Sequence, residues 1–136
     1  MKANELRIGN KIIGVYSDGE NDELEDICTV LALDETGEIN GHKIWVESSN
    51  SNAEIFSEFK PIPLTEEWLI RFGFDNLGKF GWGIGDFHIE NTKNLRGKYK
   101  YKYCFRTISR KIIRVTTVHQ LQNMFYILTG KELRTK

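Results

Sequence analysis

Short runs of apolar residues separated by polar turns fill the first 60 residues, which is the pattern of β-strands with a buried face. We expect strands at residues 11–16, 27–33, 42–47 and 55–59, because each run is rich in β-branched or aromatic residues. The nearly continuous apolar run at 27–33 predicts a central, buried strand. Together these runs predict a small β meander or barrel, for which an SH3-like arrangement is one candidate.

The stretch 17–26 separates the first two predicted strands and carries six acidic residues with Leu24 as its only large apolar side chain. Its acidic positions do not follow the alternate spacing, central Gly and final Glu of an EF-hand loop. We therefore expect a solvated connection rather than a cation site.

After position 60 the pattern changes to helices flanking strands. Pro61 and Pro63 cannot donate backbone hydrogen bonds, so they mark a boundary. Thr65 is placed as the N-cap of a short helix that ends at Gly73, with Trp68 on its buried face.

Residues 79–89, 99–106 and 111–118 predict three antiparallel strands joined by polar turns. A final helix is expected over 117–129, with Thr116 or Thr117 as its cap and Gly130 as its stop. Its apolar stripe is Val118, Leu121, Phe125 and Leu128.

These elements predict an α+β fold, in which a β-rich N-terminal half is followed by a helix, an antiparallel sheet and a C-terminal helix. The 136 residues suit a single compact domain over 1–136, with sub-units at 1–60 and 64–136 that share one core. Cys28 and Cys104 each lie in an apolar run, so we expect two reduced core cysteines rather than a disulfide or a zinc site.

The net charge of zero hides an asymmetry along the chain. Residues 1–90 hold 7 Lys and Arg against 18 Asp and Glu, whereas residues 91–136 hold 12 against 1. The basic end therefore raises the question of a partner with negative charge, such as nucleic acid.

The best binding candidate is the strand at 98–106, where lysines alternate with aromatic residues. One hypothesis is structural: the aromatic face is core and the lysines protect an exposed sheet edge from association. The other is functional: the cations form a patch for a phosphate backbone, helped by an exposed tyrosine that stacks on a base. The candidate nucleic-acid-binding residues are Arg96, Lys98, Lys100, Lys102, Arg106, Arg110, Lys111 and Arg114.

Other chemistry has weaker support. Asp86, His88 and Glu90 alternate on one predicted strand and are the candidates for a metal site, but no second group of His or Cys completes a ligand set. The glycines at 78–85 lack the following helix of a phosphate-binding loop. His119 is expected on the surface. With no activated nucleophile in the pattern, we expect no catalytic residue, no cofactor and no resident metal, while an enzyme activity stays open.

Three stretches resemble a family of small uncharacterised proteins from Bacteroides-type gut bacteria, their prophages and other mobile elements. The stretches are 6–10, 61–74 and 118–133, about a quarter of the chain. The resemblance implies a full-length accessory protein of phage or mobile-element origin and carries over no activity or substrate. The acidic stretch 17–26 and the Lys–Tyr alternation are not part of that family's pattern.

The sequence thus leaves two main hypotheses for function. The first is a non-catalytic accessory protein that acts through contacts with an unknown protein partner. The second is a protein that binds nucleic acid without sequence specificity through its basic C-terminal part. No apolar run approaches the length of a bilayer span, and the first residues lack the apolar stretch of a secretory signal, so we expect a cytoplasmic protein without membrane contact.

Overall fold

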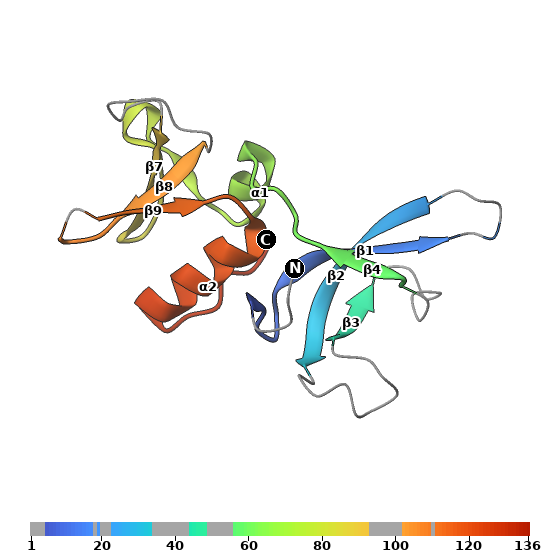
Figure 1. Ribbon diagram of the computed structural model, residues 1–136. Coiled ribbons are helices and arrows are strands. Elements are labelled where there is room, and N and C mark those ends of the chain that lie inside the picture. The colour runs from blue at the N-terminus through green and yellow to red at the C-terminus, as the bar shows by residue number, and fades with distance from the viewer. Residues whose placement is uncertain are drawn as a thin grey trace. The chain divides into compact units, whose positions relative to one another are not determined.

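A computed structural model describes residues 5–17, 19, 23–33, 44–48, 56–92, 102–109 and 111–136. The fold is α+β and rich in strands, with two antiparallel sheets and a C-terminal helix (Figure 1). The chain divides into two units, Met1–Ile62 and Pro63–Lys136, one sheet in each. That the two share one core stays a prediction, and so does the SH3-like arrangement of the first.

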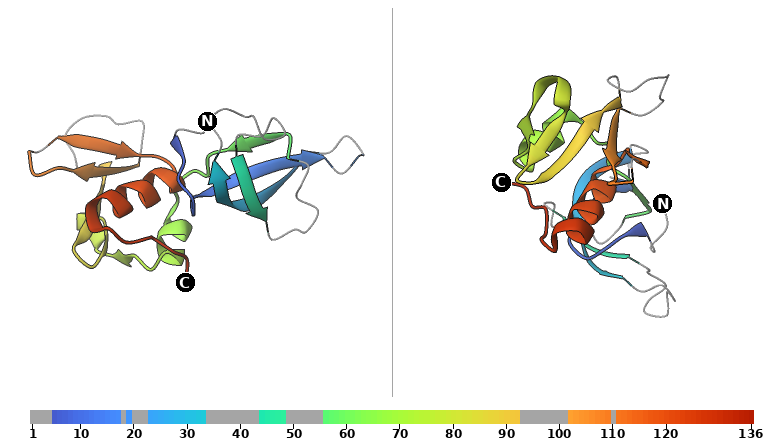
Figure 2. Two further views of the ribbon diagram at one scale, coloured as in Figure 1. Left: turned by 90° about the horizontal axis from the view of Figure 1, so that it is seen from below. Right: turned by 90° about the vertical axis from the view of Figure 1, so that its left-hand side faces the viewer.

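The first unit is a four-stranded antiparallel sheet, best seen in Figure 2. Its strands are β1 (Lys11–Ser17), β2 (Glu23–Leu33), β3 (Ile44–Ser48) and β4 (Glu58–Lys60), in the order β3-β2-β1-β4. Leu6, Ile12, Cys28 and Val30 form the buried centre. Partly buried hydrophobic residues pack around this centre: Leu33, Ile44, Val46, Phe56 and Phe59.

Two predictions for β2 need correction. The strand begins at Glu23, because its pairing with β1 extends to Ser17 opposite Glu23, so the acidic connection is shorter than 17–26. Although β2 is central in the sheet, only one face is buried: Cys28 and Val30 are inaccessible, while Leu31 is 51% exposed. The acidic side chains of Glu23 and Glu25 reach solvent from a paired strand. Their backbone N–H and C=O groups can therefore bond to β1 while the charges stay hydrated.

The second unit begins with a short helix, α1 (Glu66–Arg71), capped at both ends as the sequence predicts. The Thr65 hydroxyl accepts a hydrogen bond from the Trp68 amide at 3.4 Å. At the other end Gly73 has φ +87°, and the amides of Gly73 and Phe74 donate to the carbonyls of Ile70 and Leu69, both at 2.9 Å. This pair of bonds is a Schellman motif, which leaves few helix-end groups without a partner.

The sheet of the second unit has five antiparallel strands in the order β5-β6-β7-β8-β9. A 3₁₀ turn, η3 (Gly78–Phe80), lies between β5 and β6. The strands are β5 (Asp75–Asn76), β6 (Trp82–Ile84), β7 (Phe87–Asn91), β8 (Tyr103–Arg106) and β9 (Ile112–Val115).

The strand predicted over 79–89 is wrong. In its place η3 is followed by a hairpin of β6 and β7, which turns at Gly85 and Asp86. Glycine makes both changes of direction: Gly81 has φ +100° and Gly85 has φ +57°. The backbone passes so close at Gly81 that an added Cβ would lie 2.1 Å from the Ile89 carbonyl oxygen.

The C-terminal helix, α2 (Val118–Thr129), has the predicted ends. Thr117 and Gln120 form a reciprocal capping box, and Gly130 takes the left-handed conformation at φ +72°. Val118, Leu121 and Phe125 are buried as predicted, but Leu128 is half exposed near the end of the helix. His119 is buried rather than at the surface. It lies in the first turn of the helix, directly after the segment where Pro63 and Leu64 pair with Thr117 and Thr116.

Phe87 is the centre of the aromatic core in this unit. It stacks on Phe105 of the neighbouring strand β8, with ring centroids 5.6 Å apart. It also makes edge contacts with Phe125 of α2 at 5.3 Å and with Phe74 after α1 at 6.1 Å. One side chain therefore joins both helical segments to the sheet.

Replacing Phe125 by Ala should lower the free energy of unfolding by about 3–5 kcal/mol, because it opens a cavity against Phe87. The control is Ile127→Ala on the same helix, which should change the stability by less than about 0.5 kcal/mol, since Ile127 is 75% exposed. Urea unfolding followed by circular dichroism measures both. Equal midpoints for the two variants would contradict the helical register described.

Gly81→Ala should destabilise the second unit by at least about 4 kcal/mol, because the new methyl group meets backbone rather than a movable side chain. Gly85→Ala is the matched control: Gly85 also has positive φ, but no atom lies within 4 Å of its added Cβ. It should cost only about 1–2 kcal/mol from backbone strain. Similar losses of stability at both positions would show that crowding at Gly81 is relieved by a backbone shift.

Candidate functional site

The outer face of the second sheet carries the described part of the predicted basic strand. Register places Cys104 of β8 between Glu90 of β7 and Arg114 of β9, and it places Arg106 opposite Ile112. Side chains opposite one another share a face, so the cations Arg106 and Arg114 lie on the same side of the sheet. Tyr103 and Phe105 lie on the inner side with Phe87. We call the surface formed by Glu90, Arg106, Ile112 and Arg114 the outer face.

Half of the eight predicted nucleic-acid-binding residues can be placed. Arg96, Lys98, Lys100 and Arg110 lie outside the described residues. Of the other four, Arg106 and Arg114 belong to the outer face, and Lys111 falls by alternation on the opposite side. Lys102 precedes β8, and its ammonium group lies near Tyr103 and Glu66. The structure therefore brings two of the predicted cations, Arg106 and Arg114, to the same face.

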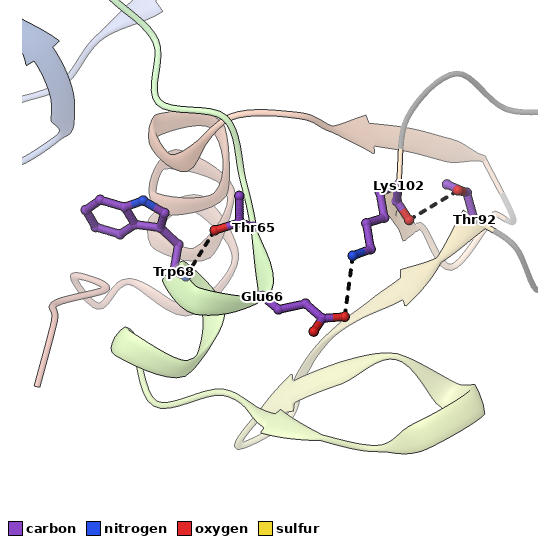
Figure 3. A network of polar contacts seen from close by, with 5 residues as sticks. All are labelled: Thr65, Glu66, Trp68, Thr92 and Lys102. Carbon is purple, nitrogen blue, oxygen red and sulfur yellow. Dashed lines mark hydrogen bonds and ion pairs between the residues drawn. The ribbon is translucent and has the colours of Figure 1, made fainter.

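Two of the four described cations are already paired with carboxylates. Arg106 Nε donates to Glu90 Oε2 at 2.9 Å, between neighbouring strands. Lys102 Nζ donates to Glu66 Oε1 at 3.4 Å, across 36 positions of sequence (Figure 3). The Lys102 carbonyl also accepts hydrogen bonds from the amide and the hydroxyl of Thr92, and these bonds hold the backbone from which the Lys102 side chain extends. Within the described part of the chain, no ion pair involves Lys111 or Arg114.

The aromatic side of β8 is not available to a base. Tyr103 is buried beneath the sheet, while Tyr99 and Tyr101 lie outside the described residues. Burial raises the pKa of the Tyr103 phenol, against the opposing effect of the Lys102 ammonium. Desolvation lowers the pKa of Lys102, but its contacts with Tyr103 and Glu66 outweigh this and raise the pKa. Lys102 is therefore a fully charged side chain held next to two partners.

The structural hypothesis assumed that the basic strand is a sheet edge, and for β8, the described part of that strand, this is wrong. β8 lies between β7 and β9, so its backbone groups are paired on both sides. The edge strand is β9, which carries Ile112, Ile113 and Arg114. Lys102 and Arg106 consequently need another explanation, and their carboxylate partners supply a structural one.

The predicted metal candidates do not assemble into a site. Asp86 is in the turn between β6 and β7, so it does not share a strand face with the other two. His88 Nε2 contacts the Phe80 carbonyl oxygen, and Glu90 accepts from Arg106. Among the described ranges, no group of three or more His, Cys, Asp or Glu side chains could hold a metal ion.

Both cysteines are buried, free thiols with raised pKa values. Burial raises the pKa of Cys28 from 9.0 to about 11, and the nearby Asp26 carboxylate adds to the effect. Burial also raises the pKa of Cys104, with Glu90 raising it further and Arg106 lowering it. A thiol that holds its proton at neutral pH is a weak nucleophile, so neither residue has the environment of a catalytic cysteine.

Sequence reasoning missed the surface around the β8–β9 turn. Ile108 is fully exposed in the turn. On β9, Ile113 is 39% exposed on the inner side, where Lys111 also lies, while Arg114 is exposed on the outer face. We call these four residues the hairpin surface. The isoleucines of β9 gave no clear pattern in the sequence, because Ile112 and Ile113 are adjacent and only the strand register places Ile112 on the outer face and Ile113 on the inner side.

Comparison with protein families, with curated protein sequences and with solved structures gave no match for this chain. The resemblance of 6–10, 61–74 and 118–133 to proteins of gut bacteria and their mobile elements therefore stays a prediction. Where residues are described, the helices are too short to cross a bilayer.

The pKa of Cys28 predicts a pH dependence of stability. Above pH 9 the unfolded chain loses the thiol proton, while the folded chain keeps it up to about pH 11. The free energy of unfolding should therefore fall by about 2–3 kcal/mol between these pH values and be constant below them as far as this thiol contributes. Cys28→Ala removes the group and should flatten that part of the profile in urea titrations. An unchanged pH slope in the variant would contradict the assignment.

Proposed function

We propose that this chain is a non-catalytic accessory protein that acts by contacting another protein through its second unit. The observation that supports this is the hairpin surface, where exposed isoleucines stand among cations. Phosphate groups are held by charge and hydrogen bonds alone, whereas apolar groups beside arginine are typical of protein interfaces. Ile108, fully exposed in the turn, is the clearest apolar contact that such a partner gains.

The charge of the second unit indicates an acidic partner. Residues 63–136 hold 14 Lys and Arg against 6 Asp and Glu, while residues 1–62 hold 5 against 13. Opposite charge on a partner accelerates its encounter and selects against partners of like charge. The boundary between the two units is thus also the boundary between an acidic and a basic surface chemistry.

A second candidate function is binding of nucleic acid without sequence specificity. The net charge of the second unit supports it, together with the absence of an ion pair at Lys111 and Arg114 among the described residues. It has less support than protein binding, because Glu66 and Glu90 already neutralise Lys102 and Arg106. Counterion release from the remaining cations would make such binding steeply salt dependent.

The proposed setting is the cytoplasm of a bacterium that carries a phage or mobile element. The resemblance in three stretches supports the origin. Two buried free cysteines, one in each unit, suit a reducing compartment.

Tagged protein should capture a specific partner protein from cells that express it, and the capture should survive nuclease treatment. The combined change Ile108→Ser and Arg114→Glu should reduce capture at least tenfold. Lys131→Glu is the charge-matched control, since Lys131 is exposed beyond the end of α2, and it should leave capture unchanged. Quantitative mass spectrometry measures the three samples.

Loss of all captured protein on nuclease treatment would favour the nucleic-acid function instead. That function also predicts retention of the purified protein on DNA or RNA at about 50 mM salt, lost at several times that concentration. No retention at low salt would eliminate it.

A further inference from the structure

β9 is the last strand of its sheet, and alternate residues turn their backbone groups away from β8. The amide of Thr107 donates to the carbonyl of Lys111 at 2.9 Å, so Lys111 faces β8. In an antiparallel pair the hydrogen-bonded positions alternate, so the backbone groups of Ile113 and Val115 also face β8. The N–H and C=O groups of Ile112 and Arg114 therefore face the open edge.

The next residue along the strand confirms this alternation. By the same rule Thr116 faces outward, and its carbonyl accepts from the Leu64 amide at 3.0 Å. Pro63 forms an isolated antiparallel bridge with Thr117. The outward side of this segment thus already receives a strand-like partner at one end. Within the described part of the chain, the remaining edge at Ile112–Arg114 has none.

We propose that the open edge of β9 binds an extended acidic segment of a partner protein as a sixth strand of the sheet. This rests on the proposed protein-binding function and specifies its site and the chemistry of its ligand. Two outward residues offer two N–H donors and two C=O acceptors, which is the pattern used when a peptide adds to a sheet edge. Because Leu64 occupies the edge at Thr116, the added segment is short, about five residues.

The side chains of β9 specify the composition of that segment. Arg114 is on the outer face and has no ion pair with a described residue, so an acidic residue is favoured beside it. Ile113 is on the inner side and is partly exposed, so an apolar residue is favoured beside it. Since side chains alternate along an added strand, the matching segment alternates acidic and apolar residues.

A second copy of this chain fits the same edge less well. Antiparallel pairing of two β9 edges would centre on Ile113 and set Arg114 of each copy opposite Ile112 of the other. Both copies would then bring Arg106 and Arg114 to one continuous face of the joined sheet. Like charges at an edge disfavour such association, whereas an acidic segment is attracted to them.

The test uses the full-length protein and a synthetic peptide with the alternation Glu-Val-Glu-Val-Glu, capped at both ends. Amide hydrogen exchange followed by NMR measures each backbone group separately. The amides of Ile112 and Arg114 should exchange rapidly in the free protein and at least tenfold more slowly with saturating peptide. The amides of Ile113 and Val115 bond to β8 and should be protected in both states. Binding that leaves the exchange of Ile112 and Arg114 unchanged would be charge attraction alone and would overturn the proposal.

Two variants test the backbone and the charge independently. Ile112→Pro removes an outward donor and no bond to β8, so peptide affinity should fall at least tenfold with an unchanged unfolding midpoint. Arg114→Glu should weaken binding of the Glu-Val peptide at least tenfold and favour the matching Lys-Val peptide, which keeps the test decisive if the proline variant does not fold. Lys131→Glu should affect binding of neither peptide. Equal affinity of wild type and Arg114→Glu for the acidic peptide would contradict the proposal.

The alternative occupants give different results. Concentration-dependent dimerisation that protects the Ile112 amide without peptide would assign the edge to a second copy and overturn the acidic segment. Protection of the same amide by duplex DNA but not by peptide would do so as well. If the peptide fails while cellular capture still depends on Ile108 and Arg114, strand addition is wrong and the protein-binding function stands. If capture also fails, both are wrong.

Discussion

The contact of Phe87 with three other phenylalanines holds the second unit together. Phe87 stacks on Phe105 within the sheet and meets Phe74 and Phe125 edge-on from outside it. Each partner belongs to a different segment, so the sheet, α2 and the turn after α1 share a single aromatic centre. Pairing of β7 with β8 and the docking of α2 place Phe87 on the inner side. Because side chains alternate along each strand, Glu90, Arg106 and Arg114 then lie on the outer face.

Local chemistry made parts of this fold predictable. Thr65 and Thr117 cap the beginnings of α1 and α2, and Gly130 caps the end of α2, as the sequence indicates. These positions are predictable because a cap depends on a few neighbouring residues. The hairpin at 82–91 was not predictable in the same way, because Gly81, Gly83 and Gly85 fit a strand bulge as well as a turn. Only the approach of Gly81 to the Ile89 backbone shows which applies. The burial of His119 likewise could not be predicted from its neighbours in the sequence.

The candidate site shows why counting cations in a sequence overstates free positive charge. The alternation at 98–106 identified Lys102 and Arg106 as one face of a strand, and the described register places Arg106 on the face opposite to Phe105. It could not show that Glu66, 36 residues away, reaches Lys102, or that Glu90 on the neighbouring strand β7 pairs with Arg106. Nor could it show that β8 is internal, which depends on the order of all five strands. The edge strand on this side of the sheet is β9, for which the sequence predicted a strand but no position in the sheet.

The placement of the two cysteines makes the chain a reporter of its own local opening. Cys28 is buried in the first unit and Cys104 in the second, so each thiol is shielded by a different sheet. A thiol-specific reagent can modify either residue only when the unit around it opens, and the rate of modification then measures the free energy of that opening. Peptide mapping distinguishes the two labelled sites, so a single time course would show whether the acidic and the basic unit unfold as one cooperative structure or as two.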